Sequence, residues 1–304
     1  MNHARPRYLE SKRSIDQRAF SRPVRDRFFD ELPSEPRIFE AGCGTGVTVP
    51  RLLSWGVEAG RYRGVDTDPR IIAFARAVRP QELRREGHAT GNVPPEDGVS
   101  PTDAAPDEDG RPDFTAADLS VRFATGDALA ALESSSTTGY DAVVAQAFAD
   151  LVAPSRLASA VESSLRPGGL AYFPITFDGG TLFQPDHPAD DAVEKAYHTA
   201  IDDRPGHDPR AGRHLLDLLG RRDGDLLAAG GSDWIVRPRN GGYPADERYF
   251  LSRILGFIAE AVPPTSVDVP DFDDWLATRR EQLAAGTLTY VAHQYDLLYR
   301  SATE

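Results

Sequence analysis

The chain has few of the residues on which several classes of protein depend. Only one of its 304 residues is a cysteine, Cys43, which excludes a disulfide framework and a zinc site built from cysteines. No apolar run approaches the roughly 20 residues that a membrane-spanning helix needs, and the first residues lack the apolar core of a signal peptide. We therefore expect a cytoplasmic protein that does not cross a membrane.

Lysine is nearly absent. Lys12 and Lys195 are the only two, and 47 acidic residues outnumber 34 basic ones to give a net charge of −13. This composition is typical of the acidic, halophile-like surface of a salt-adapted protein; an arginine-rich, GC-rich genome is the alternative explanation. On either explanation nucleic acid is an unlikely partner, because phosphate binding depends on basic side chains.

The stretch from residue 37 to residue 53 organises the chain. A short apolar run ends in Glu40, three glycines follow at Gly42, Gly44 and Gly46, and apolar residues suited to a packed helix come next. A strand, a glycine turn and a helix in this order form a nucleotide site at the carboxyl end of a parallel strand. Glycine permits backbone angles that a Cβ forbids and lets a ligand touch the main chain.

The spacing of the glycines indicates which nucleotide. The dinucleotide fingerprint G-x-G-x-x-G would place its third glycine at position 47, where this chain has Val47. Valine at this position argues against a nicotinamide oxidoreductase. The E-x-G-x-G-x-G form resembles the first motif of the class I S-adenosylmethionine-dependent methyltransferases. The alternative is a glycine turn before an ordinary helix.

Further features of that family follow in order. A second strand, residues 62–66, ends in Asp66 about 20 residues after the glycines, where a carboxylate accepts from ribose hydroxyls. Asp68 fits the N-cap of the next helix, with Pro69 at its first position. A third strand at residues 121–124 precedes Asp127, and a fourth is expected at residues 140–146, where Asp141 is interpreted as structural. A Pro-Gly-Gly turn then precedes a fifth strand at residues 170–177. The resemblance implies that Asp127 accepts from the adenine amino group.

The resemblance predicts an α/β fold with a seven-stranded, mostly parallel, Rossmann-like methyltransferase sheet and helices on both faces. We expect one domain, residues 1–304, with a helical extension at 1–36 and a cofactor-binding core at 37–177. An acidic, proline-rich stretch at 80–118 is predicted to be a disordered insertion. Residues 178–304 complete the sheet and cap the acceptor site, with helices expected at 189–201, 210–219, 246–262 and 273–284 and strands at 232–236 and 288–294.

The predicted site follows from the same motifs. Cofactor contacts are expected from the glycine turn and the ends of the strands, namely Glu40, Ala41, Gly42, Cys43, Gly44, Gly46, Asp66, Thr67, Asp127, Ala128 and Gln146. Acceptor contacts are expected from Phe148, Asp233, Trp234 and Tyr243. The catalytic residue is left open, with His293, His214 and Asp150 as candidates. The N-terminal extension brings Tyr8, Lys12 and Arg18 towards the ligand, or these residues simply solvate a helix.

The predicted function is transfer of a methyl group from S-adenosyl-L-methionine to a small-molecule acceptor by in-line displacement. Positioning supplies much of the rate in such a reaction, and a base is needed only if the acceptor must lose a proton. No metal site is expected from the histidine spacing. An RNA-modifying methyltransferase and a non-catalytic, cofactor-binding regulatory protein are the alternatives. The acceptor, the methylated atom and the oligomeric state are left open.

Overall fold

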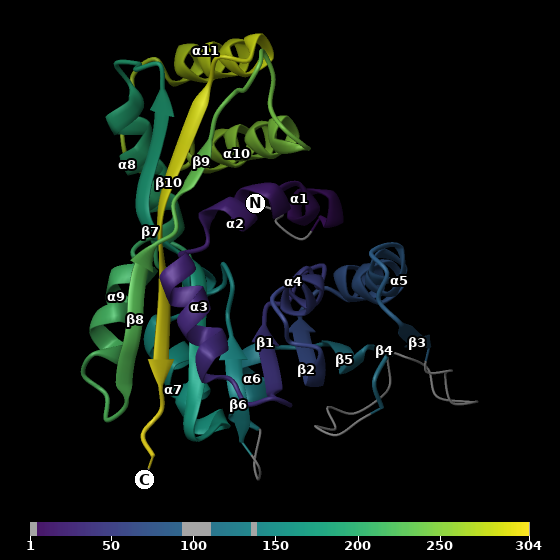
Figure 1. Ribbon diagram of the computed structural model, residues 1–304. Helices are drawn as coiled ribbons and strands as arrows, with labels where there is room; N and C mark the ends of the chain where they lie inside the picture. Colours follow the sequence, from purple (N-terminus) through teal and green to yellow (C-terminus); the bar gives the residue numbers. More distant parts are fainter. Residues whose placement is uncertain (1–4, 93–110, 135–138, 304) are drawn as a thin grey trace.

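A computed structural model describes residues 5–92, 111–134 and 139–303 (Figure 1). Its centre is one mixed sheet in which strands far apart in the sequence lie side by side. Across the sheet the order is β3 (Thr90–Asn92), β4 (Phe114–Ala116), β5 (Asp118–Thr125), β2 (Ala59–Asp66), β1 (Arg37–Ala41), β6 (Tyr140–Val144), β7 (Leu165–Gln184), β10 (Thr289–Arg300) and β8 (Asp225–Gly231), with β9 (Trp234–Val236) also paired to β10.

The strands from β5 to β7 are parallel, and β10 and β8 close that side in antiparallel fashion. The chain runs from β1 to β2 and β5 on one side, and then returns to β6 on the other side of β1. The strand order therefore reverses at β1. In an open sheet of this type, ligands bind beyond the carboxyl ends of the strands at such a reversal.

The predicted count of seven strands is wrong, because the described part of the sheet has ten. Two of the additional strands, β3 and β4, form an antiparallel pair at the edge. The third is β8, a glycine- and alanine-rich strand that pairs with the second half of β10. The strands predicted at 232–236 and 288–294 are confirmed as β9, which pairs with the first half of β10, and β10.

The stretch predicted to be a disordered insertion, residues 80–118, contains regular structure at both ends. Helix α5 (Pro69–Arg85) continues through Pro80, and β3 and β4 lie within the stretch. The helix continues because its buried stripe passes the proline, from Ile72 and Ala75 to Arg79 and Leu83. Residues 93–110 lie outside the described residues.

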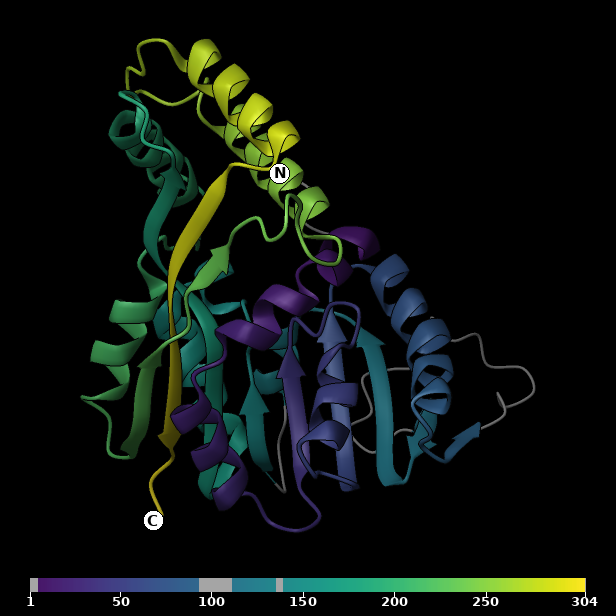
Figure 2. The same cartoon turned by 45° about the horizontal axis from the view of Figure 1, so that its top comes forward.

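Helices cover both faces of the sheet (Figure 2). One face packs against α3 (Arg22–Glu31), α4 (Thr48–Ser54) and α5, and the other against α6 (Ala128–Glu133), α7 (Pro154–Ser164) and α9 (Ala211–Leu219). The predicted helices at 189–201, 210–219, 246–262 and 273–284 are confirmed as α8 (Asp190–Asp202), α9, α10 (Glu247–Ala261) and α11 (Phe272–Ala285). None of the helices in the described ranges combines the length and apolarity that a bilayer crossing requires.

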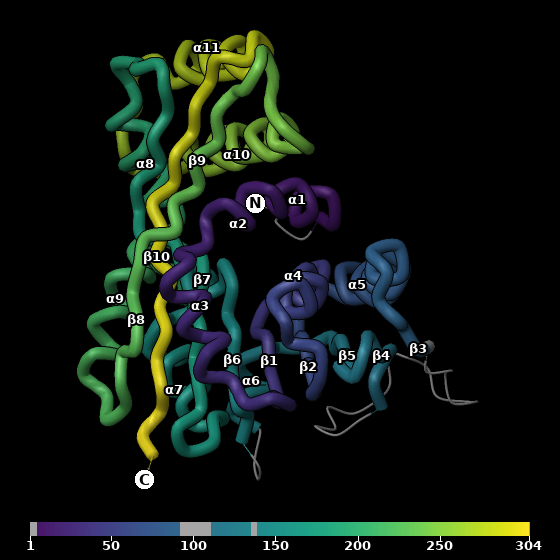
Figure 3. Tube along the Cα trace, in the orientation of Figure 1, coloured from purple at the N-terminus to yellow at the C-terminus, as the bar shows by residue number. Residues whose placement is uncertain are grey.

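Besides the hydrophobic cores on the two faces of the sheet, a third hydrophobic core lies beyond the carboxyl edge of the parallel strands. The upper parts of β7 and β10 extend into it and meet α8, α10 and α11 (Figure 1). Helices α1 (Pro6–Ser11) and α2 (Arg13–Ala19) also belong to it, and Tyr8 stacks on Phe250 with ring centroids 5.9 Å apart. The N-terminal segment then passes β9 and reaches β8 through α3 (Figure 3).

One buried carboxylate fixes α2 over the sheet. Asp16 is fully buried and accepts hydrogen bonds from Trp234 Nε1 and Gln146 Nε2, each at 3.0 Å. Arg51, on α4, lies 3.6 Å from the same carboxylate and donates to Gln146 Oε1 at 3.0 Å. A single residue thus ties the N-terminal extension to α4, β6 and β9.

Replacing Asp16 with alanine is expected to lower the free energy of unfolding by about 3–5 kcal/mol, because buried Arg51 loses its counter-ion and two donors lose their acceptor. Chemical denaturation followed by circular dichroism measures this change. Asp26→Ala is the matched control, since Asp26 is 61% exposed and pairs with Arg25 at the surface, and it should cost less than about 1 kcal/mol. Equal losses of free energy of unfolding in the two variants would contradict the role of Asp16 in holding α2 over the sheet.

Candidate functional site

The glycine turn after β1 accepts only glycine at two of its positions. Gly42, Gly44 and Gly46 have φ angles of +67°, +52° and +74°, which are strained for other residues. A Cβ at Gly42 would lie 2.4 Å from Phe148 Cδ2, and one at Gly46 would lie 2.4 Å from Phe123 Cζ. The turn therefore packs closely against its own chain, with Leu9 of α1 approaching Gly44.

Asp66 holds this turn from the neighbouring strand. Its Oδ2 accepts from the Gly44 N–H at 3.1 Å, and its Oδ1 accepts from the Asp68 N–H at 3.0 Å. The main chain of the turn is bonded to β2 as well, because the N–H groups of Gly42 and Cys43 donate to Val65 O. Burial raises the pKa of Asp66, although the hydrogen bonds from the N–H groups of Asp68 and Gly44 oppose the rise. Each oxygen still has a lone pair for a ligand hydroxyl.

Asp127 lies beside Asp66 at the same edge. Strand β5 pairs with β2 so that Thr125 is opposite Asp66, and Asp127 follows two residues later. Its Oδ1 caps α6 by accepting from the N–H groups of Leu129 and Ala130, at 2.8 and 3.2 Å. Its Oδ2 accepts no hydrogen bond from the described residues, and the side chain is exposed. Two carboxylates thus lie at the carboxyl ends of adjacent strands, and Asp66 is hydrogen-bonded to the glycine turn.

Glu40 lies beneath the turn and is 2% exposed. One carboxylate oxygen accepts from Thr48 Oγ1 at 2.7 Å, and the other accepts from the Tyr62 hydroxyl. Burial raises the pKa of Glu40 to about 7. Glu40 therefore supports the turn, and its predicted contact with a cofactor stays a prediction. So do the contacts predicted for buried Ala41, Cys43 and Ala128 and for exposed Thr67.

The exit of β6 places Gln146 and Phe148 next to the turn. Gln146 is held by Asp16 and Arg51, and Phe148 covers Gly42. Sequence reasoning missed Asp16 as a partner here, because it stands between Ile15 and Ala19 on a helix where a carboxylate would ordinarily face solvent. Its burial depends on Trp234, which is 218 residues away in the sequence.

The other predicted acceptor residues already have partners within the chain. Trp234 is buried against Asp16, and Asp233 accepts from His293. The hydroxyl of Tyr243 donates to Leu288 O at 2.8 Å, next to the start of β10. Arg18 donates to buried Glu247 of α10. These contacts stabilise the cap, and the predicted roles in acceptor binding stay predictions.

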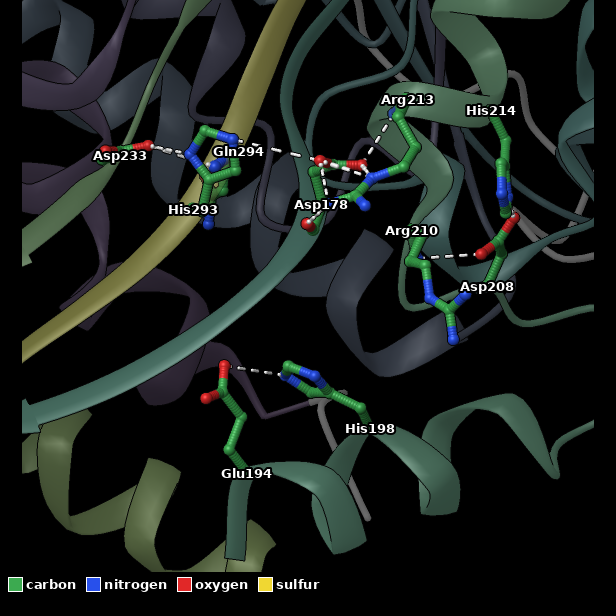
Figure 4. Close-up of polar contacts among 10 residues, drawn as sticks. All are labelled: Asp178, Glu194, His198, Asp208, Arg210, Arg213, His214, Asp233, His293 and Gln294. Carbon is green, nitrogen blue, oxygen red and sulfur yellow. Dashed lines mark hydrogen bonds and ion pairs between the residues drawn. The ribbon is translucent and has the colours of Figure 1, made fainter. Parts of the chain in front are cut away.

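The two candidate histidines, His293 on β10 and His214 on α9, each pair with a carboxylate (Figure 4). His293 Nδ1 lies 2.8 Å from Asp233 Oδ1, and its Nε2 lies 3.9 Å from Asp178, which Arg213 also binds. His214 Nδ1 lies 2.6 Å from Asp208 Oδ2. Neither histidine is placed beside the glycine turn by these contacts. Within the described ranges, no three His, Cys, Asp or Glu side chains gather to hold a metal ion.

Comparison with known proteins gives matches among solved structures only: no family model and no curated protein matches the chain. A SAM-dependent methyltransferase from Thiobacillus denitrificans, in complex with S-adenosyl-L-homocysteine, is 16% identical, with 98% of this chain and 99% of that chain covered and a TM-score of 0.47. A SAM-dependent methyltransferase from Geobacter sulfurreducens, with the same ligand, is 16% identical, with 97% of this chain and 98% of that chain covered and a TM-score of 0.47. The [4+2]-cyclase SpnF is 16% identical, with 93% of this chain and 80% of that chain covered and a TM-score of 0.42.

The raised pKa of Glu40 predicts an unusual dependence of stability on pH. Because the folded chain holds this proton more tightly than the unfolded chain, Glu40 contributes stability that is fully present below about pH 4.5 and lost as the pH rises through about 7. We expect Glu40→Gln, which mimics the protonated form, to reduce the fall in stability between about pH 5 and pH 8 by on the order of 2–3 kcal/mol. Urea denaturation of both proteins at the two pH values measures the fall in the free energy of unfolding. The same fall in the unsubstituted protein and in Glu40→Gln would refute the prediction.

Proposed function

We propose that the chain binds S-adenosyl-L-methionine at the carboxyl edge of β1, β2 and β5 and transfers its methyl group to a small-molecule acceptor. The observation that carries this proposal is the pair Asp66 and Asp127, two carboxylates at the ends of adjacent parallel strands beside a turn of close-packed glycines. The site lies where the strand order reverses, which is the place expected for a nucleotide.

The residues present fit the nucleoside half of this cofactor. Asp66 keeps acceptor capacity for the two ribose hydroxyls, and Asp127 Oδ2 is available to the adenine amino group. The available acceptors are suited to N–H and O–H donors. They are poorly suited to a pyrophosphate, because like charges repel. Together with Val47 in place of the fingerprint glycine, this favours a sulfonium nucleoside over a dinucleotide.

When bound, S-adenosyl-L-methionine supplies a methyl group on a positively charged sulfur, which keeps the electron pair of the broken bond and becomes neutral. The chain then has to align the acceptor and exclude water. The contacts of α1 and α2 support a role in this task, since Leu9 approaches Gly44 and Asp16 binds Gln146 at the exit of β6. The acidity of the chain supports a small molecule rather than RNA as acceptor.

Asp66→Ala is expected to weaken binding of S-adenosyl-L-homocysteine by about 100-fold, which corresponds to the loss of two hydrogen bonds to a carboxylate. Isothermal titration calorimetry measures this affinity. Asp68→Ala is the matched control, because Asp68 caps α5 through the Arg70 N–H. That variant should lose about 1 kcal/mol of stability and keep its affinity within about threefold.

The same titration with NAD distinguishes the two nucleotide classes. We expect heat of binding with S-adenosyl-L-methionine and none with NAD. Binding of NAD alone would refute the proposed function, and so would equal affinity of the unsubstituted protein and Asp66→Ala for S-adenosyl-L-homocysteine. Incubation with methyl-labelled cofactor and either total RNA or a small-metabolite extract identifies the acceptor class, since we expect label only in the metabolites.

A further inference from the structure

A cavity of about 420 Å³ lies between the N-terminal helix α1 and the cap helices α10 and α11. Helix α10 packs against both of the other helices (Figure 1). The residues that line the cavity are Arg7, Asp246, Arg248, Tyr249, Ser252, Leu255, Arg280, Leu283 and Ala284. None of them belongs to the glycine turn or to the ends of β2 and β5. A volume of this size is typical of sites that bind small molecules.

Helical spacing brings these side chains to the cavity. On α10, Arg248, Ser252 and Leu255 follow one another at intervals of four and three residues, which places them on one face of the helix. On α11, Arg280 is followed by Ala284 one turn later. Each helix therefore presents an arginine together with a small side chain, a serine on one helix and an alanine on the other. Small side chains leave a space between helices that larger ones would fill.

The lining has a net positive charge, although the whole chain has a net charge of −13. Arg7 is paired, because its Nε and Nη2 donate to the two carboxylate oxygens of Asp246 at 3.1 and 3.2 Å. Arg248 and Arg280 are exposed, and neither forms an ion pair with an acidic side chain in the described ranges. Two guanidinium groups beside the cavity thus have N–H donors available to a ligand.

Apolar side chains form another part of the lining. Leu255 and Leu283 are 1% and 7% exposed. The guanidinium of Arg7 lies 4.0 Å from the centroid of the Tyr249 ring and covers one of its faces. The hydroxyl of Ser252 donates to Tyr249 O at 2.7 Å, so it is bonded within its own helix. The cavity therefore combines exposed cations with buried hydrocarbon.

We infer that this cavity binds a small organic anion whose carboxylate or phosphate group lies on Arg248 and Arg280. The apolar part of the anion then contacts Leu255 and Leu283. A guanidinium presents its N–H groups in a fork that matches either anionic group. The first turn of α10, which contributes to the lining, adds the positive end of a helix dipole. A cation would be repelled by the arginines, and a neutral molecule would gain no charge-assisted hydrogen bond from them.

Isothermal titration calorimetry of the full chain with benzoate, phenyl phosphate and benzamide tests this inference. Benzamide has nearly the shape of benzoate but no charge. We expect both anions to bind and benzamide not to bind, and the anion with the higher affinity shows which acidic group the arginines prefer. Arg248→Ala and Arg280→Ala should each weaken the binding of the anions by about tenfold or more, because each removes a charged hydrogen-bond donor.

Arg237→Ala is the matched control, because Arg237 is an exposed arginine that follows β9 and lies outside the cavity. It should leave the affinity for the anions unchanged. Ala284→Trp tests the cavity itself, since the indole occupies the space between the helices without removing a charge. We expect this variant to lose binding and to keep the circular dichroism spectrum of the unsubstituted protein.

The inference would be overturned by equal affinity for benzoate and benzamide, or by no binding of either anion. Unchanged affinity in both arginine variants would also overturn it, and so would full binding by Ala284→Trp. The inference does not depend on the proposed function. Titration of the same preparations with S-adenosyl-L-homocysteine separates the two, because failure to bind that ligand would refute only the proposed function.

Discussion

The hydrogen bond from the Gly44 N–H to the Asp66 carboxylate joins the two elements on which the candidate site depends. It holds the turn after β1 against the end of β2, and it fixes the orientation of a carboxylate at the edge where Asp127 follows β5. The bond requires Gly44 to keep a positive φ, and it requires β1 and β2 to pair in the observed register, with Ala41 opposite Val65. The geometry of the site is therefore a consequence of strand pairing.

The second constraint is the buried acid on α2. Asp16 replaces its lost hydration with contacts to Trp234, Gln146 and Arg51, and it brings the N-terminal helices over the edge where Asp66 and Asp127 lie. Burial with these partners stabilises the cover of the site.

The sequence predicts the parts of this structure that follow from local rules. The glycine spacing, the Asp68 cap and the four late helices depend on neighbouring residues, and the structure confirms them. The edge strands β3 and β4 were missed because they are three residues long and flank a polar stretch. The cluster that contains Tyr8, Tyr197 and Tyr290 was also beyond reach, since these residues meet only through the packing of α1, α8 and β10.

Strand β7 has 20 residues and β10 has 12, and the two pair along almost the whole length of β10. Their lower halves belong to the central sheet, and their upper halves form the floor on which α8, α10 and α11 pack. The cap is consequently not a detachable module. Grafting it from another protein would mean replacing two interior strands, because the same continuous ribbon of β7 and β10 belongs both to the central sheet and to the cap.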